Sequence, residues 1–296
     1  MANTLTDLKN ILVSQNAINP WLKELLPMSC FSTNFSSDIA QQGDTVRVPL
    51  IGATNASSVF DGDYTKNSDS TITSIPVTLN KHRFNTVHMS ATERASMSTE
   101  MLSRLVANAT KQLAIDVLTD VLSCVTAANY GEPVATITGG AFDYDKVIAI
   151  RKACGADNMP LANRSLILNP VLFSALLSDA RVAQSANQQI TANAIVDAAL
   201  PRIAGFTTYE TNALPDNSEN LAGIACDPSG IAVAMRYLEP VANYMDSGAV
   251  TDPTTGITYG FLEFSDTRAN RVNITVECLY GYAVARKAAI KRIVTA

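Results

Sequence analysis

The chain has 296 residues, of which 47% are hydrophobic and only 17% are charged, against about 25% charged residues in average globular proteins. This shortage of charge predicts that other subunits cover much of the surface, because no window of about 20 residues is apolar enough to span a membrane. The formal net charge of −5 disfavours a protein that binds nucleic acid mainly by neutralising phosphates.

Two short helices are predicted at the N-terminus. Leucines recur at helical spacing within residues 2–15 and 18–27. Pro20 stands where a proline can begin the second helix.

Residues 45–90 are predicted to form one long β-hairpin. Two arms of alternating apolar residues flank residues 51–70, which are rich in Gly, Ser, Asn and Asp. With about 15 residues in each arm, the hairpin would extend about 50 Å. Such a ribbon is marginally stable alone and has open edges, so we expect a neighbouring subunit to hold it.

A long uninterrupted helix is predicted over residues 91–128, begun by Ser90 or Thr92. It would span about 55 Å at 1.5 Å per residue. Its apolar stripe at steps of three and four comprises Met97, Met101, Leu102, Leu105, Val106, Ala109, Leu113, Val117, Val121 and Val125.

Helices and strands alternate in the next part of the chain. Asp143 or Asp145 should begin a helix that runs through Ala153 and ends at Gly155 in a left-handed cap. A buried strand follows at 165–168, and then a helix with Asn169 as N-cap and Pro170 at its first position. A further helix is expected within 188–200.

The remaining segments are predicted to be mostly strands. GFTTYETNALP (205–215) alternates, but its middle is polar and its end is blunted by Pro215. Residues 223–227 form a strand, and Asp227-Pro228 should begin a helix over the following apolar stretch. Strands are then expected at 257–266 and through the C-terminal region, with Gly281 as a β-bulge.

The sequence contains no recognisable catalytic, metal or cofactor site. The histidines, His82 and His88, lie six residues apart on one predicted strand, or about 20 Å, which is too far to share a metal ion. In the hairpin tip, oxygen ligands recur as in a calcium loop, but Lys66 stands in place of the usual glycine, so a solvated loop is favoured over a calcium site. The oxygen-bearing residues are Asp61, Asp63, Thr65, Asn67 and Asp69.

Two other residue groups bear on function. The five cysteines never form a CxxC pair and indicate buried thiols of a reducing compartment. Near the C-terminus, four bases without an intervening acid favour a solvated strand or a guarded edge over a DNA contact. These bases are Arg286, Lys287, Lys291 and Arg292.

In order and spacing, these segments resemble the major capsid proteins of tailed bacteriophages, which share the Hong Kong 97-type fold. GDTVRVPLIG, the polar tip and ITSIPVTLNKHRFNTVHMS look like the extended E-loop, and the helix from residue 91 looks like the spine helix. LANRSLILNPVLFSALLSD, GFTTYETNALP, IACDPSGIAVAMR and GYAVARKAAIKRIV look like later strands and helices of the fold.

The resemblance implies an α+β fold with an N-terminal arm, an E-loop hairpin, a spine helix, a P-domain and an A-domain. The expected boundaries are 1–43 for the arm, 44–90 for the hairpin, 91–130 for the spine helix, 131–255 mostly for the A-domain with some P-domain elements, and 256–296 for strands that return to the P-domain.

As a function, the resemblance implies a structural coat protein and not an enzyme. Its copies would form the hexamers and pentamers of an icosahedral shell that packages double-stranded DNA non-specifically, assembled in the bacterial cytoplasm and located in the virion. A separate scaffolding protein is expected because only about forty residues precede the E-loop, and a portal protein is expected at one vertex.

Six residues are candidate contacts between subunits: Asp61, Asp63, Lys66, Arg83, Tyr209 and Glu210. The first four belong to the predicted hairpin, and the other two belong to the polar strand at 205–215. Two alternatives remain open: an encapsulin shell, which shares this fold and encloses an enzyme cargo, and a cytosolic α+β enzyme.

Overall fold

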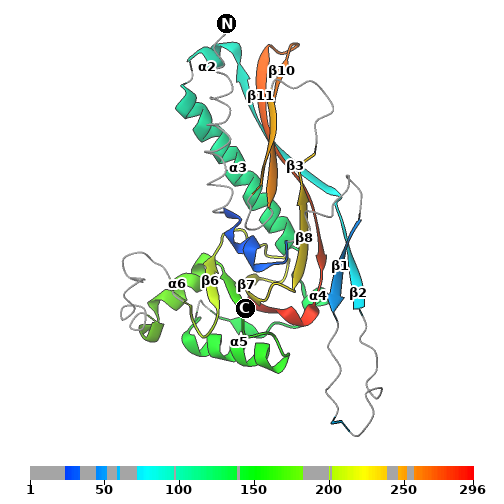
Figure 1. The fold of residues 1–296 in the computed structure, drawn as a ribbon. Coiled ribbons are helices and arrows are strands. Elements are labelled where there is room, and N and C mark those ends of the chain that lie inside the picture. Colours follow the sequence, from blue (N-terminus) through cyan, green and yellow to red (C-terminus); the bar gives the residue numbers. More distant parts are fainter. Residues whose placement is uncertain are drawn as a thin grey trace.

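The computed structural model describes residues 24–33, 45–51, 59–60, 72–96, 98–138, 141–182, 200, 202–238, 246–251 and 257–296. The helix expected at 2–15, the start of the one at 18–27 and nearly all of the one within 188–200 lie outside these residues. Three sheets and the helices that cover them make up the described part of the chain (Figure 1).

The longest sheet lies beside the longest helix. The helices are η1 (Leu26–Cys30), α2 (Ala91–Ser96), α3 (Thr99–Leu122) and α4 (Ala127–Tyr130). The strands are β3 (Lys81–Ser90), β8 (Ile231–Arg236), β9 (Asp246–Thr251), β10 (Thr258–Asp266) and β11 (Arg271–Val284). They are ordered β3-β11-β10-β9, and β8 takes a place beside the second half of β11. The buried side of α3 packs on this sheet in one hydrophobic core.

A second sheet and two helices form the other end of the molecule (Figure 1). The sheet is ordered β4-β12-β7-β5-β6. Its strands are β4 (Ala135–Ile137), β5 (Ser165–Leu168), β6 (Thr207–Glu210), β7 (Leu221–Cys226) and β12 (Ile290–Thr295). The helices are α5 (Tyr144–Ala156) and α6 (Pro170–Ser178), and a 3-10 turn, η3 (Lys287–Ala289), leads into β12. A separate core lies between these helices and the sheet.

Residues 45–90 do not form one long hairpin. Residues 45–51 (β1) pair with residues 72–78 (β2) in a two-stranded sheet. Residues 81–90 instead pair with β11 along ten successive positions. The prediction of two arms of about 15 residues was therefore wrong for the second arm, because the alternating pattern of β3 suits any sheet and does not specify its partner.

The long helix is interrupted and shorter than predicted. Ser90 begins α2 as expected: its hydroxyl accepts from the Glu93 amide, and the Glu93 carboxylate accepts from the Ser90 amide. Ser98 is extended, and its side chain caps α3 by accepting from the Met101 amide at 3.2 Å. The serine competes with the helical backbone here, so the helix restarts at residue 99 and then ends at Leu122.

The stripe of α3 is buried where it meets the sheet. Leu102, Val106, Leu113, Val117 and Val121 are all buried. Met101 and Leu105, which the periodicity also assigned to the stripe, stay exposed at 58% and 36%. The predicted helical periodicity is confirmed, but the sheet covers only part of the apolar stripe that it defined.

Three local predictions need correction. The apolar stretch after Asp227-Pro228 is the strand β8 and not a helix. Gly155 lies inside α5, which continues to Ala156, and the left-handed residue nearby is Asn158 at φ 52°. Gly281 is not a bulge, because it keeps the regular register opposite Ala234.

Other local predictions are confirmed. Asp143 caps α5 through the Lys146 amide at 3.0 Å, and Asn169 caps α6 through the Leu172 amide at 2.9 Å. Pro170 is the first residue of α6. The strand at 165–168 is buried along its whole length.

Candidate subunit interface

The hairpin β1–β2 lies at the margin of the molecule, beyond β8 (Figure 1). Its base is anchored by Val46, Val48, Val77 and Leu79, which are buried on β8 and β11 in a core of their own. Among the described residues, no third strand pairs with either β1 or β2. Open strand edges of this kind invite pairing with another chain.

Two apolar residues lie in the connection between β1 and β2. Val59 is 91% exposed and Phe60 is 59% exposed. The predicted contacts Asp61, Asp63 and Lys66, and the calcium-like pattern, follow directly after them and lie outside the described residues. The sequence analysis did not name Val59 and Phe60 as contact candidates, because it considered only the charged residues of this polar connection.

Arg83, a predicted contact, belongs to a polar network that joins β3, α3 and β11. Its Nε donates to the Tyr280 hydroxyl at 3.0 Å, which in turn donates to Asp120 at 2.7 Å. Lys81 pairs with the same carboxylate at 2.8 Å and donates to the Tyr282 hydroxyl at 2.9 Å. The network holds the helix onto the sheet.

The charge of Asp120 is stabilised in the folded chain. Burial raises its pKa, but hydrogen bonds from Lys81 and Tyr280 outweigh this effect, and the net pKa is lowered. A lowered folded pKa means that this stabilisation is present above the unfolded pKa of about 3.9 and is lost as the pH falls through the folded value.

Asp120→Asn is expected to lower the free energy of unfolding by about 2 kcal/mol at pH 7, because charged hydrogen bonds are lost from a half-buried site. Urea denaturation from pH 7 to pH 3 should show the difference from wild type shrinking below about pH 4. Glu100→Gln on the same helix is the control: its pair with Arg104 is exposed on both sides, so a change within about 0.5 kcal/mol is expected. An equal effect of both changes would contradict the network's role.

Tyr209 and Glu210 lie on β6, the edge strand of the second sheet. Glu210 is exposed and could meet a neighbouring chain. Tyr209 is half-buried and packs against the core that contains α3 and Cys30, and burial raises its pKa. Within one subunit, Tyr209 therefore contacts the N-terminal turn η1.

The histidines are paired separately. His82 Nε2 lies 3.0 Å from a Glu277 carboxylate oxygen, and His88 Nδ1 lies 2.8 Å from the Asn273 side-chain oxygen. Within the part of the chain that the structure describes, no group of three or more His, Cys, Asp or Glu side chains could hold a metal ion.

The C-terminal basic group is solvated only in part: Lys287 is exposed, whereas Lys291 and Arg292 form ion pairs within the chain. Arg292 is 2% exposed, forms an ion pair with Glu219 and donates to the Gly131 carbonyl at 2.8 Å. Lys291 pairs with Asp157. Two of the four bases thus anchor β12 to neighbouring loops, which the sequence could not reveal because their acids lie 73 and 134 residues away.

The thiol prediction is confirmed: all five cysteines are free, and all except Cys124 are fully buried. Burial raises the pKa of Cys124 and of Cys278 to about 12. Such thiols stay protonated and unreactive at neutral pH.

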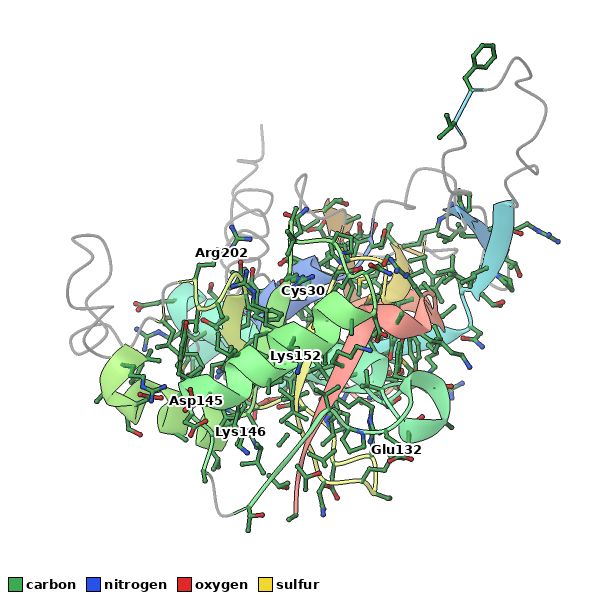
Figure 2. All side chains as sticks on the ribbon, turned by 90° about the horizontal axis from the view of Figure 1, so that it is seen from below. Cys30, Glu132, Asp145, Lys146, Lys152 and Arg202 are labelled. Atoms are coloured by element: carbon green, nitrogen blue, oxygen red, sulfur yellow. The ribbon has the colours of Figure 1, made fainter. Side chains whose placement is uncertain are left out.

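Helix α5 presents charged side chains on the lower face of the molecule. Figure 2 shows Asp145, Lys146 and Lys152 on this helix. A hollow of about 430 Å³ lies where the start of α5 meets the end of α6. Its acids are already used within the chain, because Asp143 caps α5, Asp145 pairs with Arg181, and Asp179 accepts from the Tyr144 amide. The hollow is therefore explained by structural contacts.

No described helix is both long enough and sufficiently apolar to cross a lipid bilayer. A scan against protein-family models found no match, and a search of curated proteins found none either.

Solved structures of phage capsids share the fold. The capsid of the cyanophage P-SCSP1u matches with a TM-score of 0.60 at 10% identity, covering 90% of this chain and 86% of that chain. The capsid of Ralstonia phage GP4 matches with a TM-score of 0.56 at 13% identity, covering 88% and 85%. A structure from Mycobacterium phage Che8 matches with a TM-score of 0.58 at 17% identity, covering 89% of both chains. The chain therefore has the α+β fold of phage capsid proteins, as its sequence predicted.

Proposed function

We propose that this protein is a structural major capsid protein of a tailed bacteriophage, whose copies form the hexamers and pentamers of an icosahedral shell around double-stranded DNA. The observation that carries the proposal is the likeness to phage capsid structures over about nine tenths of both chains. Self-assembly also explains the low charge of the sequence and the open-edged hairpin with an apolar connection.

The elements fit the parts of such a subunit. We assign β1–β2 to the extended loop that reaches a neighbour, α3 to the spine helix, and the sheet β3-β11-β10-β9 to the P-domain. The sheet β4-β12-β7-β5-β6, with α5 and α6, corresponds to the A-domain, so β12 belongs there and not, as the sequence suggested, to the P-domain. In this arrangement Glu210, on an exposed edge strand, meets the next subunit around a symmetry axis.

The further partners follow from the proposed role. A separate scaffolding protein would direct shell closure in the host cytoplasm, a portal protein would occupy one vertex, and packaged DNA would be held without sequence specificity. The net charge of −5 agrees with weak, non-specific contact between coat and DNA.

Electron microscopy of the recombinant protein, alone and with its candidate scaffold, tests the proposal. Closed icosahedral particles are the expected result. Particles that hold an enzyme cargo and no DNA, when isolated from their natural source, would favour an encapsulin shell. A monodisperse monomer or dimer at high concentration, with or without scaffold, would contradict both shell functions and favour an enzyme.

A further inference from the structure

Gly281 lies at the point where the hairpin passes over the long sheet. The ladder between β3 and β11 ends at Lys81 and Tyr280, one residue before this glycine. A Cβ at position 281 would lie 2.1 Å from the backbone oxygen of Thr78 and 2.8 Å from its carbonyl carbon. Thr78 is the last residue of β2, so these backbone atoms cannot turn aside as a side chain could.

Apart from Leu279 and Leu238, the side chains of β8, β11 and their ends that pack against the hairpin are alanines. Ala232 and Ala234 of β8 are buried beneath the hairpin, and Ala283 and Ala285 pack around the same core. Val77 and Leu79 of the hairpin are fully buried against this floor. Because Gly281 has no side chain, the backbone at the end of β2 lies directly on β11.

From this contact we propose that Gly281 is a positioning residue, which sets the angle at which hairpin β1–β2 leaves the subunit and thereby its reach to a neighbouring copy. The last step rests on the proposed function. Any side chain here must move Thr78 away by about 1 Å or more to restore an ordinary carbon–oxygen contact of about 3.3 Å. The hairpin has seven residue pairs and is roughly 23 Å long, so a tilt of about 5° at its base moves its far end by about 2 Å.

The angle can be measured in the unassembled subunit. Spin labels are placed on cysteines introduced at the exposed positions Ser74, toward the far end of β2, and Lys287, on η3. Cys124, the one native thiol that is not fully buried, is replaced by serine. Gly281→Ala is expected to shift the distance between the labels by about 2 Å, measured by double electron–electron resonance, and to reduce the yield of closed shells at least tenfold.

Two matched glycine variants serve as controls. Gly260 lies in the same sheet, and in Gly260→Ala the three atoms nearest to the added Cβ belong to Tyr237, at 2.5 Å, and Glu277, neither of which is part of the hairpin. In Gly248→Ala, on β9, it would meet nothing within 4 Å. Neither is expected to shift the label distance. An unchanged distance in folded Gly281→Ala, or the same shift in Gly260→Ala, would overturn the proposal.

A second variant keeps the test decisive if Gly281→Ala does not fold. Ala283→Val adds two methyl groups to the half-buried floor beneath the hairpin and should shift the distance in the same way. If it leaves the distance unchanged, the floor does not set the angle and the proposal fails. Wild type that forms no shells would refute the proposed function, whereas the distance measurement still decides the role of Gly281.

Discussion

Deleting residues 51–70 is expected to leave a folded subunit that no longer closes shells. The hairpin base is buried on β8 and β11 through Val46, Val48, Val77 and Leu79, all of which the deletion keeps. Helical ellipticity and the urea midpoint should therefore stay near wild type. Assembly should fail, because the deletion removes the segment proposed to reach a neighbour.

The junction of this deletion can be designed from the register. Leu50 pairs with Thr73, so the deletion leaves two residues, Thr71 and Ile72, to connect the strands. Replacing these two with Asn-Gly supplies the positive φ angles that a type I′ turn requires, which β-branched residues resist. A correctly closed hairpin keeps its base on the sheet, so that a loss of shells reports on the missing segment.

Two further variants distinguish the effect of the segment's length from the effect of its side chains. A Gly-Ser segment of the same length in place of residues 51–70 keeps the reach but removes its side chains. The double change Val59→Ser and Phe60→Ser removes only the exposed apolar pair. Normal shells from the deletion, seen by electron microscopy, would refute the role of the segment. Normal shells from the double change alone would assign the contact to its other residues.

Leu113→Pro should lower the free energy of unfolding by about 3 kcal/mol or more. Leu113 is buried in the middle of α3. Proline removes its amide hydrogen bond, and the ring clashes with the carbonyl four residues earlier, on Ala109. That carbonyl also accepts from the Asn85 side chain at 3.2 Å, so the change disturbs the seam between helix and β3 as well.

Urea denaturation followed by circular dichroism measures this loss. Thr99→Pro is the matched control, because residue 99 is the first of α3, where a proline is tolerated. Leu113→Ala measures how much of the lost stability comes from side-chain packing alone, since alanine removes most of the buried side chain but keeps the helix. Equal stability of Leu113→Pro and Leu113→Ala would contradict the helical continuity of α3 at this position.

Local signals in the sequence determined much of the secondary structure. Ser90, Asp143 and Asn169 each begin a helix as predicted, because an N-cap needs only the amides a few residues ahead. The spacing of α3 and the joint order of the segments also led to the correct fold. Of the interface candidates named from the sequence, Arg83 and Glu210 are exposed in the described chain, whereas Tyr209 is half-buried.

Only the tertiary structure decided which strands pair and which segments close on one another. The start signal Asp227-Pro228 predicted a helix for the apolar run of β8, but such a run also fits a buried strand, and its pairing with the second half of β11 makes it one. β3 pairs with β11 and not with the first arm of the predicted hairpin. Arg292 is buried because it forms an ion pair with Glu219, 73 residues away. The role proposed for Gly281 depends on its contact with Thr78. Each outcome depends on partners far apart in the chain, whereas periodicity and capping report only on neighbours within a few residues.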